Sequence, residues 1–167
     1  MNIRKETPVD IEAIHRVTRD AFLDAPHTDH TEHFIVKALR DAGVLTLSLV
    51  AEQEGEVVGH VAVSPVEISD VKQGWYGLGP ISVAPGLQGQ GIGSGLMQAA
   101  ITELKKLNAA GCVLLGEPDY YGRFGFKAVD GLILADVPPE YFQALLFAGD
   151  YPQGEVKYHD AFSATAE

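Results

Sequence analysis

Residues 79–96 read Gly79-Pro80-Ile81-Ser82-Val83-Ala84-Pro85-Gly86-Leu87-Gln88-Gly89-Gln90-Gly91-Ile92-Gly93-Ser94-Gly95-Leu96. The stretch begins like a strand, Pro85 ends the strand, and a glycine-rich loop leads into a helix. The helix is predicted by apolar residues that recur every four positions: Ile92, Leu96, Ala100 and Leu104. A strand, loop and helix in this order direct unpaired backbone N–H groups and the positive end of the helix dipole at one spot. The stretch therefore predicts a phosphate or pyrophosphate site. Its glycines would let the ligand come close to the backbone, because they have no Cβ atom.

Two common phosphate-binding motifs do not account for this loop. The pair Gly89-x-Gly91 is followed by Ser94, where a dinucleotide fingerprint needs its third glycine. The pattern G-x-x-x-x-G-K-[ST] does not occur in the sequence. The loop by itself still permits a nucleotide-binding protein of another class.

The rest of the chain alternates strand and helix signals. We predict strands at residues 3–5, 45–52, 57–66, 75–83, 112–115, 126–135 and 155–162, and helices at 7–22, 31–39, 91–107, 118–124 and 138–147. The strand at 75–83 contains Gly77, Gly79 and Pro80, so it should bulge or lose a partner there. The pattern predicts a mixed α/β fold in a single domain, residues 1–167.

Composition narrows the functional classes. The 167 residues are 46% hydrophobic and 21% charged, which is typical of a folded soluble protein. No apolar run approaches the roughly 20 residues of a membrane span, and residues 1–6 lack the apolar region of a secretory signal. The single cysteine fits a reducing, cytoplasmic location. A net charge of −11 disfavours nucleic acids and anionic membranes, and either attracts cationic partners or serves solubility.

Two motifs together resemble a known family. The arrangement Gln88-x-x-Gly91-x-Gly93 resembles the acyl-coenzyme-A loop of the GNAT superfamily of N-acetyltransferases. About 27 residues later, Tyr120-Tyr121-Gly122-Arg123-Phe124-Gly125-Phe126 resembles the second family signature, an aromatic pair followed by Gly-Phe. The longer run from Gly116 to Phe126 is similar to the YhbS-like branch of the superfamily.

The resemblance implies a fold and an activity. The fold would be GNAT-like, with a twisted, mixed, mostly antiparallel sheet that contains a splayed parallel strand pair and is flanked by helices. The activity would be acetyl transfer from acetyl-CoA, a cosubstrate, to an amine in a ternary complex, without a metal. The coenzyme-binding core would span about 76–127, the acceptor side about 7–43 and a C-terminal extension about 136–167, in a monomer or homodimer.

The resemblance also implies which residues contact the coenzyme. The backbone of Ile81 and Val83 would pair with the pantetheine amides, and the Ile81 N–H would polarise the thioester carbonyl. The full predicted set is Ile81, Ser82, Val83, Gln88, Gly89, Gln90, Gly91, Ile92, Gly93 and Ser94.

Tyr121 stands four residues before Gly125, where the family usually places its general acid. A phenol at this position can protonate the departing coenzyme A thiolate. The alternative is a packing role for Tyr121. We expect Tyr120, Phe124 and Phe126 to lie in the core.

The sequence leaves the identity of the general base open. Some family members use a glutamate on the splayed strand, but residues 75–83 contain no acid. We predict Glu117 for this role. Asp119, Glu67 and His60 are alternatives, as is a chain of water molecules to the solvent.

A histidine cluster and a single cysteine are two further candidate sites. His27, His30 and His33 form a cluster with Asp29 and Glu32, which could be a metal site or a polar loop before a helix. Their region would form the acceptor wall, where acids attract a cationic amine. Cys112 lies in an apolar strand and is predicted to be a buried thiol rather than a nucleophile.

We therefore weigh two functions of different classes. The first is an acetyl-CoA-dependent N-acetyltransferase. The second is a non-catalytic acyl-CoA-binding sensor or regulatory module, which the missing base favours and Tyr121 disfavours. The sequence does not identify the acceptor amine.

Overall fold

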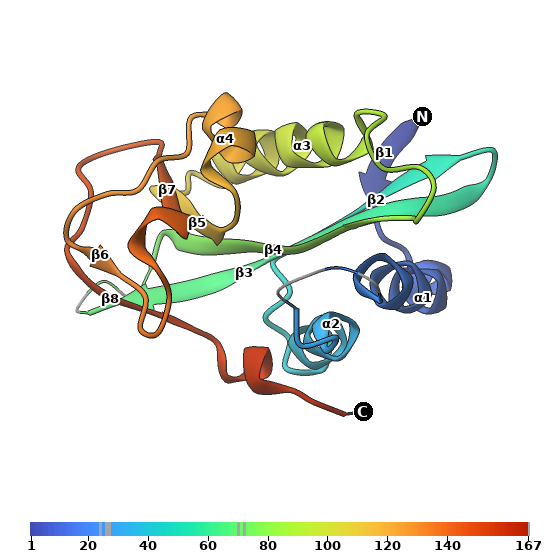
Figure 1. The fold of residues 1–167 in the computed structure, drawn as a ribbon, viewed down its shortest axis with the longest axis horizontal. Coiled ribbons are helices and arrows are strands. Elements are labelled where there is room, and N and C mark those ends of the chain that lie inside the picture. Colours follow the sequence, from blue (N-terminus) through green and yellow to red (C-terminus); the bar gives the residue numbers. More distant parts are fainter. Residues whose placement is uncertain (24, 26–27, 70, 72, 167) are drawn as a thin grey trace.

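The computed structural model describes residues 1–23, 25, 28–69, 71 and 73–166. A curved central sheet divides the molecule into two layers (Figure 1). Helices α3 and α4 cover one face of the sheet, and α1 and α2 cover the other. The segment that ends at the C-terminus runs below the sheet on the α2 side.

The elements follow the chain in this order: β1 (Asn2–Lys5), η1 (Pro8–Asp10), α1 (Ile11–Phe22), α2 (Glu32–Asp41), β2 (Leu47–Gln53), β3 (Glu56–Ile68), β4 (Trp75–Val83), α3 (Ile92–Lys106), β5 (Gly111–Leu115), α4 (Pro118–Tyr121), η2 (Gly122–Phe124), β6 (Leu132–Ile133), η3 (Pro139–Tyr141), β7 (Phe142–Leu146), β8 (Gly154–Tyr158) and η4 (Asp160–Ser163). The strand order is β1-β2-β3-β4-β5-β7, and β8 pairs with the far end of β3 and with β6. Neighbours are antiparallel, except for the parallel pairs β4–β5 and β6–β8. This confirms the predicted mixed, mostly antiparallel sheet.

The parallel pair β4–β5 holds together over only three residues of each strand. Residues 75–77 of β4 pair with residues 111–113 of β5. Beyond them β4 bulges, because Val61 and Val63 of β3 face Ile81 and Leu78, so two residues of β4 oppose Ala62 alone. The predicted irregularity at Gly79-Pro80 is confirmed. Within the described residues, 78 and 81–83 therefore pair with β3 but not with β5, and the strands splay.

Alternating side chains of β3 supply both cores. Val61 and Val63 point toward α3, where the apolar stripe of that helix is buried. Ala62 points to the other face and packs with Ile14 of α1 and Val36 of α2. Because successive side chains of a strand point to opposite faces of the sheet, β3 packs against the helices on both faces.

A capping box opens the short 3-10 helix η1, which leads directly into α1. The Thr7 backbone N–H donates to Asp10 Oδ2 at 2.7 Å, and Pro8 occupies the first turn. Arg4 of β1 donates to both oxygens of the same carboxylate, at 2.7 and 3.0 Å. Asp10 therefore ties the first strand to the first helix.

The C-terminal third departs from the sequence prediction. The strand predicted at 126–135 is wrong apart from the two residues of β6 and an isolated bridge between Lys127 and Ala144. The helix predicted at 138–147 is also wrong, because only a short 3-10 turn precedes strand β7. The run Phe142-Gln-Ala-Leu-Leu suits either state, and the free edge of β5 makes it a strand. The last predicted strand, 155–162, ends at Tyr158.

Candidate functional site

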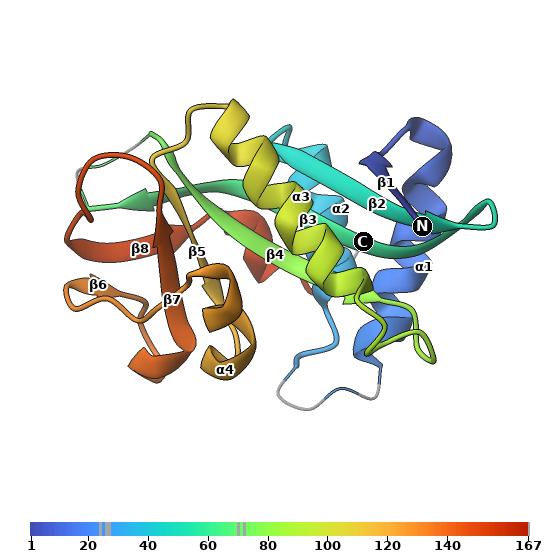
Figure 2. The same cartoon turned by 90° about the horizontal axis from the view of Figure 1, so that it is seen from above.

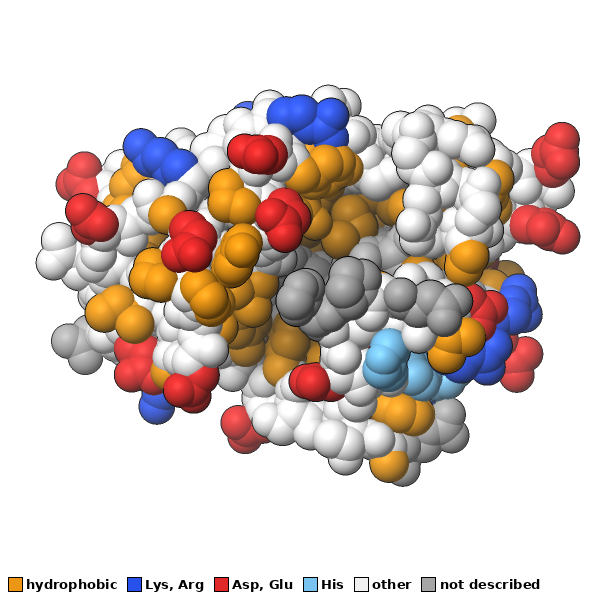
Figure 3. Space-filling model, viewed as in Figure 1, with side chains coloured by type: hydrophobic (Ala, Val, Ile, Leu, Met, Phe, Trp, Pro, Cys, Tyr) orange, Lys and Arg blue, Asp and Glu red, His pale blue; other side chains and the backbone are white. Residues whose placement is uncertain are grey.

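A pocket of about 540 Å³ lies where the splayed strand, the glycine loop and helix α4 meet. Its lining comprises Ile81, Val83, Leu87, Gln88, Gly89, Gly91, Ile92, Gly93, Ser94, Tyr120, Tyr121 and Arg123. Figure 2 shows α4 after the end of β5 and the loop before α3 beyond the end of β4. The surface is hollowed in the middle of the view in Figure 3, with hydrophobic side chains lining the hollow. The pocket thus brings together two segments that the sequence analysis had linked only by resemblance.

The direction of the β4 backbone follows from one hydrogen bond. The Ala84 N–H donates to the carbonyl oxygen of Val58 in β3 at 2.8 Å. Because successive residues of a strand turn their backbone groups to opposite sides, those of Ile81 and Val83 face away from β3. The Val83 carbonyl indeed accepts from Gln88 Nε2 at 3.2 Å, on the open side. The open edge of β4 can therefore pair with an extended amide-bearing ligand.

The loop presents its backbone at the start of α3. Gly89 and Gly91 have φ angles of +81° and +87°, which side chains other than glycine rarely tolerate. A Cβ atom at either position would meet no atom within 4 Å, so the backbone is open to a ligand. The first backbone bond of α3 runs from the Gly95 N–H to the Gly91 carbonyl at 3.0 Å. The amides of residues 92–94 precede it and lack acceptors within the helix, as in any helix start.

Tyr120 belongs to the pocket and not, as predicted, to the core. Its phenol oxygen lies 3.2 Å from Ser94 Oγ, in the first turn of α3. The Arg123 guanidinium carbon lies 4.3 Å from the centre of the Tyr120 ring. Arg123 and Leu87 also line the pocket, although neither was predicted to do so. The spacing of three between Tyr120 and Arg123 in a predicted helix was the available signal for the first of them.

Tyr121 lies between the pocket and the core. Its ring meets Tyr120 edge to face, with centroids 4.8 Å apart, and contacts the core cluster beneath α3. Burial, and to a lesser degree Tyr120, raises the pKa of the Tyr121 phenol. A Cβ atom on Gly116 would overlap the Tyr121 ring, so glycine at 116 makes room for it. The phenol is held in place and keeps its proton at neutral pH.

Three predicted residues lie outside the pocket lining. The Ser82 side chain points to the opposite face of the sheet, where its Oγ lies 3.4 Å from Thr18 Oγ1. Gln90 and Glu117 are exposed and do not line the pocket. Glu117 is the N-cap residue of α4, and its carbonyl accepts from the Tyr121 N–H at 3.1 Å.

His30 and His33 of the predicted histidine cluster have different neighbours in the structure. His27 lies outside the described residues, and His30 Nδ1 is 2.8 Å from the Phe22 carbonyl oxygen. His33 is buried in α2, with its ring centre 4.8 Å from that of His15. Among the residues that the structure describes, no group of three or more His, Cys, Asp and Glu side chains could hold a metal ion.

Cys112 is buried, and burial raises the pKa of its thiol to about 12. It is therefore protonated at neutral pH, as expected for a structural thiol. No helix in the described part of the chain is long and apolar enough to cross a membrane.

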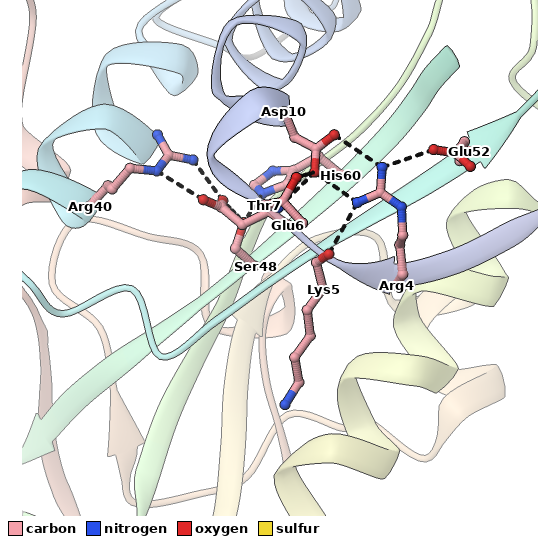
Figure 4. Close-up of polar contacts among 9 residues, drawn as sticks. All are labelled: Arg4, Lys5, Glu6, Thr7, Asp10, Arg40, Ser48, Glu52 and His60. Carbon is pink, nitrogen blue, oxygen red and sulfur yellow. Dashed lines mark hydrogen bonds and ion pairs between the residues drawn. The ribbon is translucent and has the colours of Figure 1, made fainter. Parts of the chain in front are cut away.

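The remaining alternatives for the base differ in burial. Glu67 and Asp119 are exposed, whereas His60 is completely buried. The His60 Nε2 atom lies 2.7 Å from Ser48 Oγ, within the polar network drawn in Figure 4. Burial lowers the pKa of His60 to about 4.

Comparisons with known proteins agree with this geometry. A model of the Acetyltransferase (GNAT) family matches residues 11–126. The chain is 38% identical over 128 residues to the uncharacterized N-acetyltransferase YhbS of Escherichia coli K12, covering 76% of this chain and 74% of that relative.

Two solved structures are similar over nearly the whole chain. One is a GNAT family acetyltransferase from Brucella melitensis in complex with acetyl-CoA, with 50% identity, a TM-score of 0.87 and coverage of 96% of this chain and 97% of that one. The other is YhbS from Escherichia coli in complex with CoA, with 32% identity, a TM-score of 0.88 and coverage of 99% and 93%.

Proposed function

The chain belongs to the acetyltransferase (GNAT) family, and from that membership we propose that it transfers an acetyl group from acetyl-CoA to a primary amine. The observation that carries this proposal is the pocket that joins the open edge of β4 to the start of α3. An extended amide arm suits the first part, and a diphosphate suits the second. Two similar proteins are described as complexes with acetyl-CoA and CoA.

The residues present fit this coenzyme. The amides of Gly91, Gly93 and Ser94 would hold the diphosphate, and the open glycine backbone allows close approach. The outward backbone groups of Ile81 and Val83 would pair with the pantetheine amides, once Gln88 releases the Val83 carbonyl. Arg123 adds a cation to the pocket lining.

The bound coenzyme supplies a thioester that an amine can attack directly. The Ile81 N–H, which faces the open side of β4, would polarise the acetyl carbonyl. Tyr121 would donate its proton to the departing sulfur, because burial keeps the phenol protonated. Cys112 is not needed as a nucleophile, since its thiol is buried and protonated.

A cationic acceptor suits the charge of the protein. The chain carries a net charge of −11, which raises the local concentration of protonated amines near its surface. The acceptor would be bound on the side formed by residues 7–43, which include α1 and α2.

One observation favours a second function, a non-catalytic acyl-CoA sensor. The predicted base Glu117 does not line the pocket. Acetyl-CoA binding without transfer to any acceptor would support the sensor and contradict the enzyme.

The test measures two quantities. Calorimetry gives the affinity for acetyl-CoA, and thiol release across a panel of amino acids, polyamines, aminoglycosides and peptide N-termini gives transfer. We expect binding and transfer to at least one amine. If acetyl-CoA does not bind, the coenzyme assignment fails. If it binds without transfer, the sensor is the function.

A further inference from the structure

The proposed reaction requires the amine to lose a proton, and the open edge of β4 carries no acid to receive it. Polar side chains form a row on the face of the sheet that α1 and α2 cover, and the row reaches β4 at Ser82. The row comprises Glu6, Ser48, His60, Ser82 and Thr18. We call it the polar row. It crosses the sheet from the β2 side to the open edge of β4, through side chains that the helices α1 and α2 cover.

The first part of the polar row is a continuous chain of hydrogen bonds (Figure 4). The Ser48 hydroxyl donates to Glu6 Oε1. The Ser48 oxygen also lies 2.7 Å from His60 Nε2. Ser48 has only one proton, which it gives to the carboxylate, so it accepts from His60 and Nε2 carries the ring proton.

The other ring nitrogen of His60 then holds a lone pair and no proton. Within the described residues, nothing donates to Nδ1, although His60 is completely buried. An unpaired acceptor inside a protein is costly, so it points to a donor that arrives with a ligand or with water. The two nitrogens of an imidazole point away from each other, so Nδ1 cannot share Ser48 with Nε2.

Ser82 stands between His60 and the open edge of β4. His60 and Ser82 are direct cross-strand partners, which places their side chains next to each other on the same face. Ser82 is the neighbour of Ile81, whose N–H faces the proposed thioester. The Ser82 hydroxyl oxygen is 3.4 Å from Thr18 Oγ1, which extends the polar row to helix α1.

Burial keeps the imidazole of His60 neutral. Burial lowers the pKa of His60 to about 4, while Glu6 opposes and Arg40 supports this shift. The neighbours Ser48, Ser82 and Thr18 carry no charge. Because the imidazolium form is unfavourable at neutral pH, the ring can accept a proton on Nδ1 if it releases the proton of Nε2 in the same step.

We propose that the polar row conducts the amine proton out of the active site, with His60 passing it from Nδ1 to Nε2 and Glu6 receiving it. This inference rests on the proposed function. It makes His60 a relay residue that acts through Ser82 and Ser48, and it requires no base in the pocket itself.

The step balances as follows. A bond forms between the amine nitrogen and the acetyl carbon, and the bond from that carbon to sulfur breaks. The sulfur takes the Tyr121 proton, and the phenolate left behind regains a proton from water in the pocket. The nitrogen releases its proton through Ser82 and a bridging water to His60 Nδ1, which has no hydrogen-bond partner among the described residues. Nε2 then releases its own proton to Ser48, and Ser48 protonates Glu6.

Glu6 can pass the proton to solvent. Its side chain is 18% exposed and lines a surface pocket of about 340 Å³ together with Arg40 and Ser48. Burial raises the pKa of Glu6, but hydrogen bonds from Arg40 and Ser48 outweigh this and lower it overall. The carboxylate therefore loses the proton again at neutral pH and is ready for the next turnover.

The experiment compares His60→Gln with Ser64→Ala in the intact protein. Glutamine can still donate to Ser48, but it cannot exchange a proton between two atoms as imidazole does. Ser64 is the matched control, because it is completely buried on the same face of β3 and its hydroxyl also lacks a partner among the described residues. Ser48→Ala interrupts the row at a second point. Thiol release is measured with the best amine of the panel and with water as acceptor.

We expect His60→Gln and Ser48→Ala to lower kcat by roughly 10²-fold, with acetyl-CoA affinity within twofold of the parent. Ser64→Ala should keep full turnover. In mixtures of H₂O and D₂O, the parent should show a curved dependence of kcat on deuterium content, because several protons move together. His60→Gln should lose that curvature, which a merely structural role would not change.

Unchanged kcat and curvature in a folded, coenzyme-binding His60→Gln would overturn the relay and leave the proposed function intact. If His60→Gln does not fold, Ser48→Ala decides in the same way. A loss of turnover in Glu117→Gln with His60→Gln active would assign the base to Glu117 and overturn the relay. No thiol release by the parent with any amine or water would overturn both proposals.

Discussion

The phenol oxygen of Tyr120 lies 3.2 Å from the hydroxyl oxygen of Ser94, so helix α4 touches the first turn of α3. A Cβ atom on Gly93 would come within 3.3 Å of the same phenol. The two family motifs thus meet through side chains at the diphosphate end of the proposed site. Both residues line the pocket, and they can be tested separately from the residues near the thioester.

The proposed acid predicts a selective loss of turnover. Replacing Tyr121 by phenylalanine removes the proton donor and keeps the ring that contacts the core. We expect kcat to fall by about 10²-fold and the calorimetric affinity for acetyl-CoA to stay within twofold. Tyr120→Phe is the comparison, because it removes a phenol from the same pocket. Equal turnover in Tyr121→Phe and the parent would remove the acid assignment.

The structure of the glycine loop predicts that alanine weakens acetyl-CoA binding at Gly91 but not at Gly86. Gly91 and Gly86 both have a φ of +87°, and a Cβ atom at either would meet no atom within 4 Å. Alanine should therefore cost about 1–2 kcal/mol of folding free energy at each position. Only Gly91 lines the pocket, so Gly91→Ala alone should weaken acetyl-CoA binding.

Urea unfolding and calorimetry on the two glycine variants measure these effects. Equal coenzyme affinities in Gly91→Ala and Gly86→Ala would show that the loop backbone does not contact the coenzyme.

The contact between Gly116 and the Tyr121 ring predicts that a substitution at Gly116 lowers turnover. A Cβ atom on Gly116 would overlap the Tyr121 ring, whereas one on Gly122 would meet no atom within 4 Å. Gly116→Ala should therefore displace the phenol and lower kcat, and Gly122→Ala should leave it unchanged. Steady-state thiol release decides between them. Comparable kcat values would mean that the position of the phenol does not matter for turnover.

The neutral His60 predicts a pH dependence of stability. Its folded-state pKa of about 4 is below its ordinary value of about 6.5, so the unfolded chain binds more protons between these values. His60 therefore favours folding above pH 6.5, and this contribution is lost as the pH falls toward 4. The difference corresponds to about 3 kcal/mol. Urea unfolding of the parent and of His60→Gln at pH 7 and pH 4.5 measures it.

The control in that experiment is the variant itself, because glutamine does not titrate. We expect a smaller loss of unfolding free energy between the two pH values in His60→Gln than in the parent. Parallel losses would show that the imidazole titrates normally in the folded protein.

The segments that could be predicted from the sequence are those with local causes. The bulge in β4 follows from Gly79 and Pro80 themselves, and α3 follows from its four-residue apolar spacing. Strand β7 could not be predicted, because its apolar residues suit a helix or a strand. The edge of β5, more than 25 residues earlier, makes it a strand.

The candidate site shows the same division. The backbone groups of the glycine loop were identified because glycine spacing directly reflects a backbone requirement. Tyr120 was assigned to the core, since the sequence of an aromatic cluster does not tell which ring faces a cavity. The spacing of three between Tyr120 and Arg123 relates the two residues, but only the fold places both of them beside the glycine loop.

By itself, the sequence determined that this chain has a strand, a glycine loop and a helix able to present bare amides, because those properties reside in consecutive residues. Only the tertiary structure decided that Glu6, Ser48 and His60 form one chain of hydrogen bonds. Glu6 and Ser48 are 42 residues apart, and Ser48 and His60 are 12 apart. Such contacts depend on strand register and on the packing of α1 and α2 over the sheet, which no local pattern encodes.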